Sequence, residues 1–161
     1  MSNLANRFSI EVVNKRPEII DGLPFYTGEI TIGDYKETFQ MSINSWSLED
    51  YKQQWGEGLA RIKTHDKSCL VDYIHDIKID PMIEMWVLFK VEDMVYVQQH
   101  MLSKKILEYR NSPLDIEAFS KENCYEFVRD RKVNKKGLAV SASGNRIYDE
   151  WKVSLSAFDQ Y

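Results

Sequence analysis

The chain has 161 residues, of which 43% are hydrophobic and 29% are charged, a balance typical of a globular protein. Its length allows a substantial core to form without disulfide or metal support, and we expect residues 1–161 to form a single domain. The formal net charge of −4 argues against general nucleic-acid binding, because proteins that bind phosphate backbones are normally basic.

No segment of the sequence indicates export or membrane insertion. The N-terminus lacks the charged-then-apolar order of a signal peptide. No apolar run approaches the length of about 20 residues that a membrane-spanning helix needs. Cys69 and Cys124 are too few and too far apart for a disulfide framework or a zinc site. We therefore expect a cytoplasmic protein with reduced thiols and no membrane partner.

The N-terminal third is typical of β-structure. Residues 8–13 are rich in β-branched side chains and predict a first strand, and residues 22–24 predict a loop. Residues 27–32 and 35–43 alternate between apolar and polar positions on either side of Gly33-Asp34. A glycine followed by aspartate in that place favours a hairpin with a type I′ or II′ turn.

A long helical pattern follows, and we expect the main helix to cover about residues 46–63. Its apolar positions recur at spacings of three and four and so share one face: Leu48, Tyr51, Trp55, Leu59 and Ile62. Ser47 can act as N-cap, and Asp50 three residues later is a weaker substitute for the usual glutamate of a capping box. Gly56 and Gly58 are costly in a helix interior and indicate either close approach of another backbone or a kink.

Three further strands are predicted over residues 68–74, 83–91 and 94–101. The last two are joined by Glu92-Asp93, which is not a preferred pair for a tight hairpin. We therefore expect a bulged or longer turn there.

The C-terminal part is predicted with less regular structure. Ser112-Pro113 is expected to open a short helix, with serine as N-cap and proline at the first helical position. Residues 125–133 suit either a strand or a helix followed by a strand. Residues 134–145 predict an exposed loop, residues 147–155 a strand, and the last six residues a helical turn or a frayed tail. Sequential hairpins interrupted by one main amphipathic helix indicate an α+β fold of twisted antiparallel sheet with short extra helices.

The sequence contains no catalytic signature. His75, Asp76 and Asp80 suggest a metal-dependent hydrolase as one hypothesis, although no HExxH, HxxxH or CxxC spacing supports it. Nucleophile-elbow and phosphate-loop patterns are also absent. We predict no catalytic residue, no metal site and no cofactor, and hence no enzyme.

Two charged groups of residues suggest binding instead. The basic residues from Arg129 to Arg146, with Tyr125 and Tyr148 for stacking, suit single-stranded nucleic acid as an alternative function. Acidic residues recur through the strand-loop-strand region and the next turn: Asp72, Asp76, Asp80, Glu84 and Asp93. Asp72 and Glu84 lie within predicted strands and would mark an exposed edge or face. An acidic surface beside aromatic residues suits a basic protein partner, because complementary charge speeds encounter.

Several aromatic landmarks occur in a recognisable order and spacing. They fall in three groups: Trp46, Asp50, Tyr51 and Trp55; then Trp86, Leu88, Phe89 and Val95 to Gln98; then Glu150 and Trp151. Over about residues 30–155 the sequence resembles the CdiI immunity proteins of bacterial contact-dependent growth inhibition systems. It is most similar to a branch whose fold has been likened to Whirly single-stranded DNA-binding domains, a likeness that concerns fold and does not carry DNA binding over.

The resemblance implies a small cytoplasmic protein that binds the C-terminal toxin domain of a cognate CdiA protein and neutralises it. Such toxins are commonly nucleases, and inhibition would occur by stoichiometric occlusion, with no nucleic acid bound. The segments 103–124 and 134–145 are longer than in the proteins it resembles. The shared residues belong to the scaffold, so no family site transfers, and the five acidic residues above remain our candidates for toxin contacts.

Overall fold

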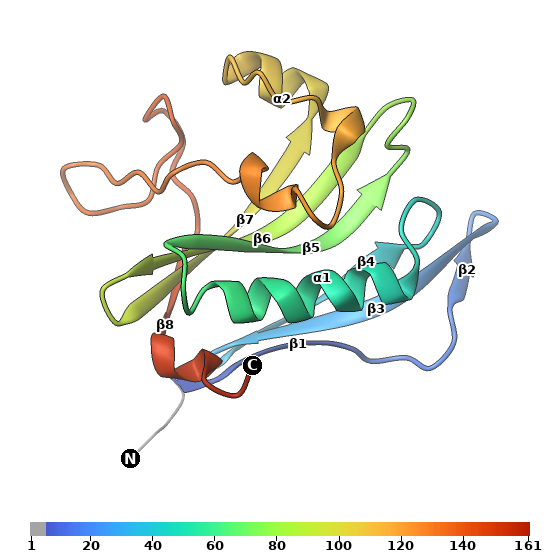
Figure 1. The fold of residues 1–161 in the computed structure, drawn as a ribbon, viewed down its shortest axis with the longest axis horizontal. Coiled ribbons are helices and arrows are strands. Elements are labelled where there is room, and N and C mark those ends of the chain that lie inside the picture. The colour runs from blue at the N-terminus through green and yellow to red at the C-terminus, as the bar shows by residue number, and fades with distance from the viewer. Residues whose placement is uncertain (1–5) are drawn as a thin grey trace.

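The computed structural model describes residues 6–161, which form two four-stranded antiparallel sheets with one long helix along their seam (Figure 1). The first sheet contains β1 (Phe8–Val12), β2 (Glu18–Ile20), β3 (Leu23–Ile32) and β4 (Tyr35–Ser42). The second has the order β5-β6-β7-β8, with bounds Lys67–His75, Met82–Val91, Met94–Ser103 and Trp151–Ser154. The predicted α+β class, built on antiparallel sheet with one main helix, is confirmed.

Strand β3 is the centre of the first sheet. It pairs with β4 along one side and with β1 and then β2 along the other. Ile30 and Ile32 are buried on one face, as the alternation predicts. Gly33 has φ of +64°, which allows the tight turn into β4. The predicted loop over residues 22–24 is wrong, because Leu23 and Pro24 already belong to β3. Strand β2 was not predicted, because its three exposed residues leave no periodic pattern.

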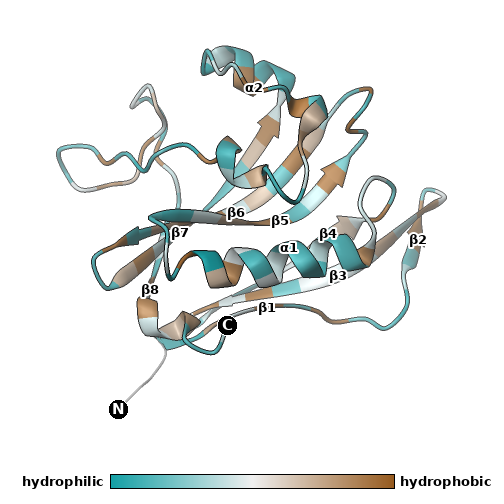
Figure 2. Cartoon of the chain, in the orientation of Figure 1, coloured by the Kyte–Doolittle hydropathy of each residue, from teal (hydrophilic) through white to brown (hydrophobic). Residues whose placement is uncertain are grey.

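Helix α1 (Leu48–Arg61) begins and ends close to the predicted positions. The capping box is complete, because Asp50 N–H donates to Ser47 Oγ at 3.1 Å and Ser47 N–H donates to Asp50 Oδ2 at 3.0 Å. Hydrophobic and hydrophilic bands alternate along the helix, as the amphipathic pattern requires (Figure 2). Of the apolar positions predicted within it, Tyr51, Trp55 and Leu59 are buried and Leu48 is half-buried.

Side chains of α1 take the place of a neighbouring strand along the outer edge of β5. Gln54 Nε2 donates to the carbonyl oxygen of Cys69 at 2.8 Å, and Gln54 Oε1 accepts from the N–H of Val71 at 2.7 Å. The indole N–H of Trp55 donates to the carbonyl oxygen of Val71 at 2.7 Å. The edge strand therefore has its buried polar groups satisfied without a ladder partner.

Gly58 permits this close approach. A Cβ atom at position 58 would collide with the carbonyl oxygen of Cys69 and lie 2.9 Å from Leu70 Cδ2. At Gly56, two residues earlier, a Cβ would meet nothing within 4 Å among residues 6–161. Of the two readings of these glycines, close backbone approach is confirmed for Gly58.

Aromatic contacts join the two sheets. Tyr35 of β4 stacks on Trp151 of β8 with ring centroids 4.6 Å apart, and Trp151 lies 5.7 Å from Trp86 of β6. Trp86 is fully buried, so this contact lies at the centre of the core. Trp86, one of the aromatic landmarks in the sequence, is therefore a core residue.

The end of the chain packs against its first strand. A 3-10 helix, Leu155–Phe158, follows β8, and the Phe158 ring lies 4.7 Å from the ring of Phe8. The Tyr161 hydroxyl donates to the carbonyl oxygen of Phe8 at 2.7 Å. These contacts fasten β1 to the segment that follows β8.

The chain between β7 and β8 covers the outer face of the second sheet. It contains helix α2 (Lys104–Tyr109) and the 3-10 helices Ile116–Ala118 and Cys124–Phe127. The helix expected to begin at Ser112-Pro113 is wrong. The α-helix occurs earlier, with Ser103 as its N-cap, and only a 3-10 turn capped by Asp115 follows Pro113. Local capping residues were present in both places, and packing on the sheet selected the earlier one.

Two further predictions differ from the structure. The turn at Glu92-Asp93 has only two residues, and the pairing continues unbroken to Val91–Met94, so the expected bulged or longer turn is wrong. Glu92 makes the turn at φ of +57°, a conformation that sequence preference disfavours for glutamate. The strand expected over residues 147–155 is confined to β8.

Residues 134–145 form two turns joined by isolated bridges, Val133–Ala139 and Val140–Ile147. Most of these residues are exposed, but Ala139 and Val140 are buried against the domain. These residues extend from the domain at the left of Figure 1.

Candidate functional site

A cavity of about 370 Å³ lies where β4 of the first sheet faces β5 and β6 of the second. Three carboxylates line it, from Glu37, Asp72 and Glu84, and we call it the acidic cleft. Two of the five predicted acidic residues therefore come together here. Glu37 was not predicted, because a glutamate in an alternating strand is normally a solvated surface residue.

Asp72 is the extra residue of a β-bulge. The register passes from the pair Val71–Met85 directly to Tyr73–Glu84, which leaves Asp72 without a partner on β6. Its side chain turns inward, and the residue is 1% exposed. The expectation that Asp72 marks an exposed face is therefore wrong, because the bulge breaks the alternation on which it rested.

The acidic cleft favours neutral carboxyl groups or a bound cation. Burial, and then the charge of Glu84, raises the pKa of Asp72 well above its ordinary value, and the nearby N–H groups of Trp86 and Gln99 offset only part of this rise. In the part of the chain that the structure describes, neither Asp72 oxygen has a hydrogen-bond partner of normal geometry. Burial and the charge of Glu37 also raise the pKa of Glu84, whose carboxylate accepts a hydrogen bond from Gln99. An ammonium or guanidinium group in the cleft would relieve both effects.

The other three predicted acidic residues lie at two ends of the second sheet. Asp76 and Asp80 are in the turn that joins β5 to β6. After burial and the charge of Glu84, the charge of Asp76 helps to raise the pKa of Tyr73, which lines the acidic cleft. Asp93 is in the turn at the opposite end of β6. Because β6 has 10 residues, the two turns are about 30 Å apart. The five residues do not form one surface, and Asp93 is separate from the cleft.

The metal-hydrolase hypothesis gains no support from the geometry. His75 Nε2 lies 3.4 Å from Asp76 Oδ2, which is an ordinary contact between sequence neighbours. Nowhere in residues 6–161 do three His, Cys, Asp or Glu side chains come together in a way that could hold a metal ion. Within the same residues, no helix is both long and apolar enough to cross a membrane.

The basic residues from Arg129 to Arg146 do not form a continuous strip. Arg131 makes a bidentate ion pair with Glu150, with Nε–Oε2 and Nη2–Oε1 distances of 2.8 and 2.6 Å. Lys132 donates to the carbonyl oxygen of Ala142 at 2.8 Å. Arg131 and Lys132, two members of the predicted nucleic-acid site, therefore bind other groups of the protein itself.

The two tyrosines predicted to stack on bases differ in their surroundings. Tyr125 is 6% exposed and its hydroxyl accepts a hydrogen bond from Gln54 Nε2 at 3.2 Å. The Arg61 guanidinium covers its ring at 4.2 Å. Tyr148 instead lies between Arg129 and Arg146, with ring-to-guanidinium distances of 4.9 and 5.2 Å.

Arg129, Arg146 and Tyr148 line a larger hollow of about 710 Å³, bounded by β7, α2 and the segment 141–148. We call it the basic pocket. Lys105 and Arg110 bring two more cations to it from α2 and the residue that follows. Neither residue was predicted, because α2 carries too little sequence pattern to be expected, and its place beside the Arg129–Arg146 segment arises only in the fold.

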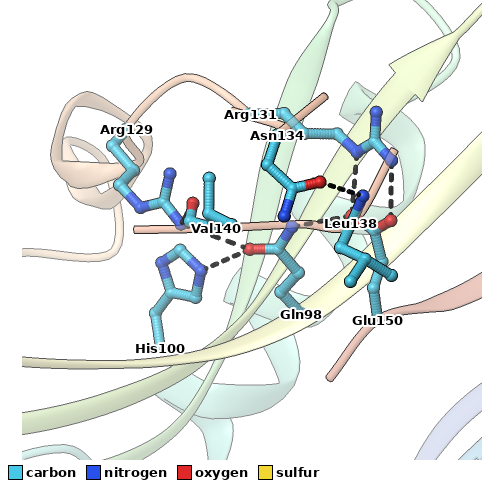
Figure 3. Close-up of polar contacts among 8 residues, drawn as sticks. All are labelled: Gln98, His100, Arg129, Arg131, Asn134, Leu138, Val140 and Glu150. Carbon is cyan, nitrogen blue, oxygen red and sulfur yellow. Dashed lines mark hydrogen bonds and ion pairs between the residues drawn. The ribbon is translucent and has the colours of Figure 1, made fainter. Parts of the chain in front are cut away.

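His100 and Arg129 of the basic pocket belong to a hydrogen-bond network around the buried Gln98 (Figure 3). Gln98 Nε2 donates to Glu150 Oε2 at 2.7 Å, which orients Gln98 Oε1 toward His100 Nε2 at 2.8 Å. Because that oxygen can only accept, Nε2 of His100 carries the proton. Burial, and then the charges of Arg129 and Arg110, lower the pKa of His100 to about 3. The imidazole is therefore neutral at physiological pH.

The two hollows adjoin. Glu84 and Gln99 line both of them, so the acidic cleft and the basic pocket share a wall. Charges of opposite sign are thus presented side by side on one part of the molecule. Such a surface is typical of a protein that recognises a partner by its pattern of charge.

The protein is therefore an α+β domain with two adjoining hollows of opposite charge. Comparison with known families identifies it further: residues 41–161 match the CdiI N-terminal domain, and the chain belongs to this family. CdiI proteins are immunity proteins, which inhibit and do not catalyse. The resemblance seen in the sequence is confirmed.

A solved structure extends the similarity to nearly the whole chain. It is described as a CdiA-CT/CdiI toxin and immunity complex from Enterobacter cloacae. The match has 25% sequence identity and a TM-score of 0.74, and it covers 95% of this chain and 94% of the other. A comparison with curated protein sequences gave no match.

Proposed function

We propose that the protein binds the C-terminal toxin domain of a cognate CdiA protein and neutralises it as a one-to-one complex. The observation that carries this proposal is membership of the CdiI family together with the similarity, over 95% of the chain, to a structure from a toxin and immunity complex. Neutralisation takes place in the cytoplasm, where an incoming toxin reaches its target.

The toxin is a nuclease with a basic substrate-binding face. A protein that holds a nucleic-acid backbone needs lysine and arginine side chains where the phosphates lie. An inhibitor that covers such a face needs acidic groups, and this chain has a net charge of −4 and an acidic cleft. Occlusion of the nucleic-acid site then explains inhibition without any catalytic step.

The acidic cleft supplies the contact for a basic side chain of the toxin. Glu37 and Glu84 line it, Asp72 lies buried in its wall, and Asp76 and Asp80 lie in the turn beside it. The charges of Glu37 and Glu84 repel one another, and this repulsion adds to burial in raising the pKa of Glu84. A lysine or arginine inserted between them would replace repulsion by attraction at a partly desolvated position.

The test is binding of the toxin domain to wild-type protein and to two variants with the same loss of negative charge. Glu37→Gln/Glu84→Gln removes two charges from the cleft, whereas Glu57→Gln/Glu122→Gln removes two exposed charges elsewhere. We expect one-to-one binding by calorimetry and protection of the toxin's nucleic-acid substrate. The cleft variant should bind about tenfold or more weakly, mainly through slower association at low salt, and the control should bind within about twofold of wild type.

Each outcome decides a separate part of the proposal. Absence of binding and of protection would refute the immunity function for the toxin tested. Tight binding with equal effects of the two variants would retain the function and refute the acidic cleft as the contact. Inhibition of a toxin without nuclease activity would refute only the class of toxin.

A further inference from the structure

The basic pocket concentrates positive charge that the fold leaves uncompensated. Lys105, Arg110, Arg129 and Arg146 all line it, and none of them forms an ion pair with a carboxylate among residues 6–161. The one carboxylate in the lining is Glu84, which shares the acidic cleft. Four cations beside one acid would repel one another in the empty pocket.

Arg129 lines the pocket and is held there by backbone carbonyl groups. Its Nη1 donates to the carbonyl oxygen of Asp130 at 3.0 Å and its Nη2 to that of Val140 at 3.2 Å. Its Nε atom is buried and has no hydrogen-bond partner within residues 6–161. The Arg129 side chain is half-buried and the hydrogen-bond acceptors around it are neutral, so a nearby anion would stabilise it.

Tyr148 holds the arginines in place around the pocket. Its ring lies against the guanidinium groups of Arg129 and Arg146 and stacks on His100 at a centroid distance of 4.9 Å. Burial lowers the pKa of Arg110, and the charge of Arg129 lowers it further. Tyr148 raises it, because it lies close enough to interact with the Arg110 guanidinium. Three arginines from different parts of the chain thus meet around one tyrosine, which makes the cluster a built arrangement.

We propose that the basic pocket binds a small phosphate ester that carries a planar ring, of the mononucleotide class. A phosphate group has three terminal oxygens and close to two negative charges, so it can engage more of these guanidinium groups than a carboxylate can. The pocket volume of about 710 Å³ lies in the range of sites for ligands well beyond the size of phosphate.

The remaining lining suits the ring of such a ligand. Tyr109 of α2 is 75% exposed, and Met101 of β7 is 45% exposed, and both line the pocket. Ile106 adds a further apolar side chain. A base or similar ring could stack on Tyr109 while its phosphate reaches Arg110 and Arg146. This binding goes beyond the proposed immunity function and does not depend on it.

The experiment measures binding of adenosine monophosphate, inorganic phosphate and adenosine to the full chain by calorimetry at low ionic strength. We expect adenosine monophosphate to bind most tightly, phosphate more weakly, and adenosine not measurably. Arg110→Gln and Arg146→Gln should each weaken adenosine monophosphate binding about tenfold or more, as loss of a charge-assisted contact requires. Lys136→Gln, which removes an exposed charge outside the pocket, should change it less than twofold.

Two further measurements locate the ligand. Tyr109→Ala should weaken adenosine monophosphate binding and leave phosphate binding unchanged. The charges of Arg129, Arg110 and Arg146 lower the pKa of His100, so a bound phosphate should raise that pKa. NMR titration of the imidazole in the wild-type protein measures this change and needs no variant. Equal affinity for adenosine monophosphate and phosphate would overturn the ring assignment.

Two outcomes would overturn the phosphate site itself. The first is equal binding of adenosine and adenosine monophosphate. The second is that wild type binds neither phosphate nor adenosine monophosphate. Loss of toxin affinity in Arg110→Gln and Arg146→Gln would then assign the pocket to an acidic side chain of the toxin instead.

Discussion

The side-chain oxygen of Gln54 accepts a hydrogen bond from the backbone N–H of Val71 at 2.7 Å, so a helix side chain completes the edge of a β-strand. The same side chain donates to Cys69 on that edge. Gln54 is 1% exposed, and neither backbone group could find water in its place. The seam between α1 and the second sheet is therefore held by directional bonds as well as by apolar packing.

Removing this carboxamide should strongly destabilise the protein. In Gln54→Ala, one buried N–H and one buried carbonyl lose their partners, and we expect the free energy of unfolding to fall by about 2–4 kcal/mol. Urea denaturation measures this change. Lys52→Ala, on the exposed side of α1, should cost less than about 0.5 kcal/mol. Equal effects of the two substitutions would show that the Gln54 bonds do not contribute to stability.

The two glycines of α1 should respond to alanine in opposite directions. Gly56→Ala adds a methyl group in open space and should raise the free energy of unfolding by about 0.5–1 kcal/mol, because alanine favours the helix. Gly58→Ala drives a methyl group into the Cys69 carbonyl and should lower it by about 2 kcal/mol or more. Thermal unfolding of both variants tests the pair, and a stabilising effect of Gly58→Ala would refute the close approach.

Asp72 should make the protein less stable as the pH rises. Its pKa is raised in the folded state, so the folded protein holds this proton at pH values where the unfolded chain, with an ordinary value of 3.8, has lost it. Asp72→Asn cannot ionise and should be more stable than wild type at neutral pH by about 1–3 kcal/mol. The difference should shrink as the pH falls toward 4. Denaturation curves across that range, with Asp93→Asn as control, would contradict this account if the difference were constant.

His100 should make the protein less stable as the pH falls. Its pKa of about 3 in the folded state lies below the ordinary value of 6.5, so the unfolded chain takes up a proton that the folded protein refuses between these values. Stability contributed by neutral His100 is present above pH 6.5 and is lost as the pH falls toward 3. From pH 7 to 5 the loss should be about 2 kcal/mol. His100→Phe, which keeps an aromatic ring but cannot ionise, should lack this component when unfolding is measured at both pH values.

Two ion pairs should differ sharply in coupling energy. Arg131 and Glu150 meet in a bidentate contact with side chains 19% and 13% exposed, whereas Lys67 and Asp130 meet on the surface at 38% and 93%. Double-mutant cycles should give about 1–2 kcal/mol for the first pair and less than about 0.5 kcal/mol for the second. Similar values would mean that burial does not strengthen the Arg131–Glu150 contact.

The sequence predicted elements with strong periodicity and missed those that packing decides. The capping box at Ser47 and Asp50 and the alternation around Gly33-Asp34 are local and were read correctly. Helix α2 has six residues and one fully buried side chain, Leu107, so it carries too little pattern to be recognised. Its position depends on the sheet beneath it.

The candidate site was predicted in part for the same reason. Asp72 and Glu84 were selected as acidic residues, but the bulge that buries Asp72 is a feature of pairing with β6 and leaves no trace in composition. The basic pocket combines Arg110 with Arg129 and Arg146, which are separated in sequence and meet only in the folded chain. Residue spacing alone cannot find a cluster of that kind.

The contact of Tyr161 with Phe8 has a consequence for the order of folding during synthesis. The two residues are 153 positions apart, so β1 must wait for nearly the entire chain before that bond can form. At a synthesis rate of about 5–20 residues per second, the wait is about 8–30 s. Until then the Phe8 ring lacks the Phe158 ring that covers it in the native state. A newly made chain would thus pass through a period in which β1 exposes apolar surface, and that is when chaperone binding or aggregation would compete with folding.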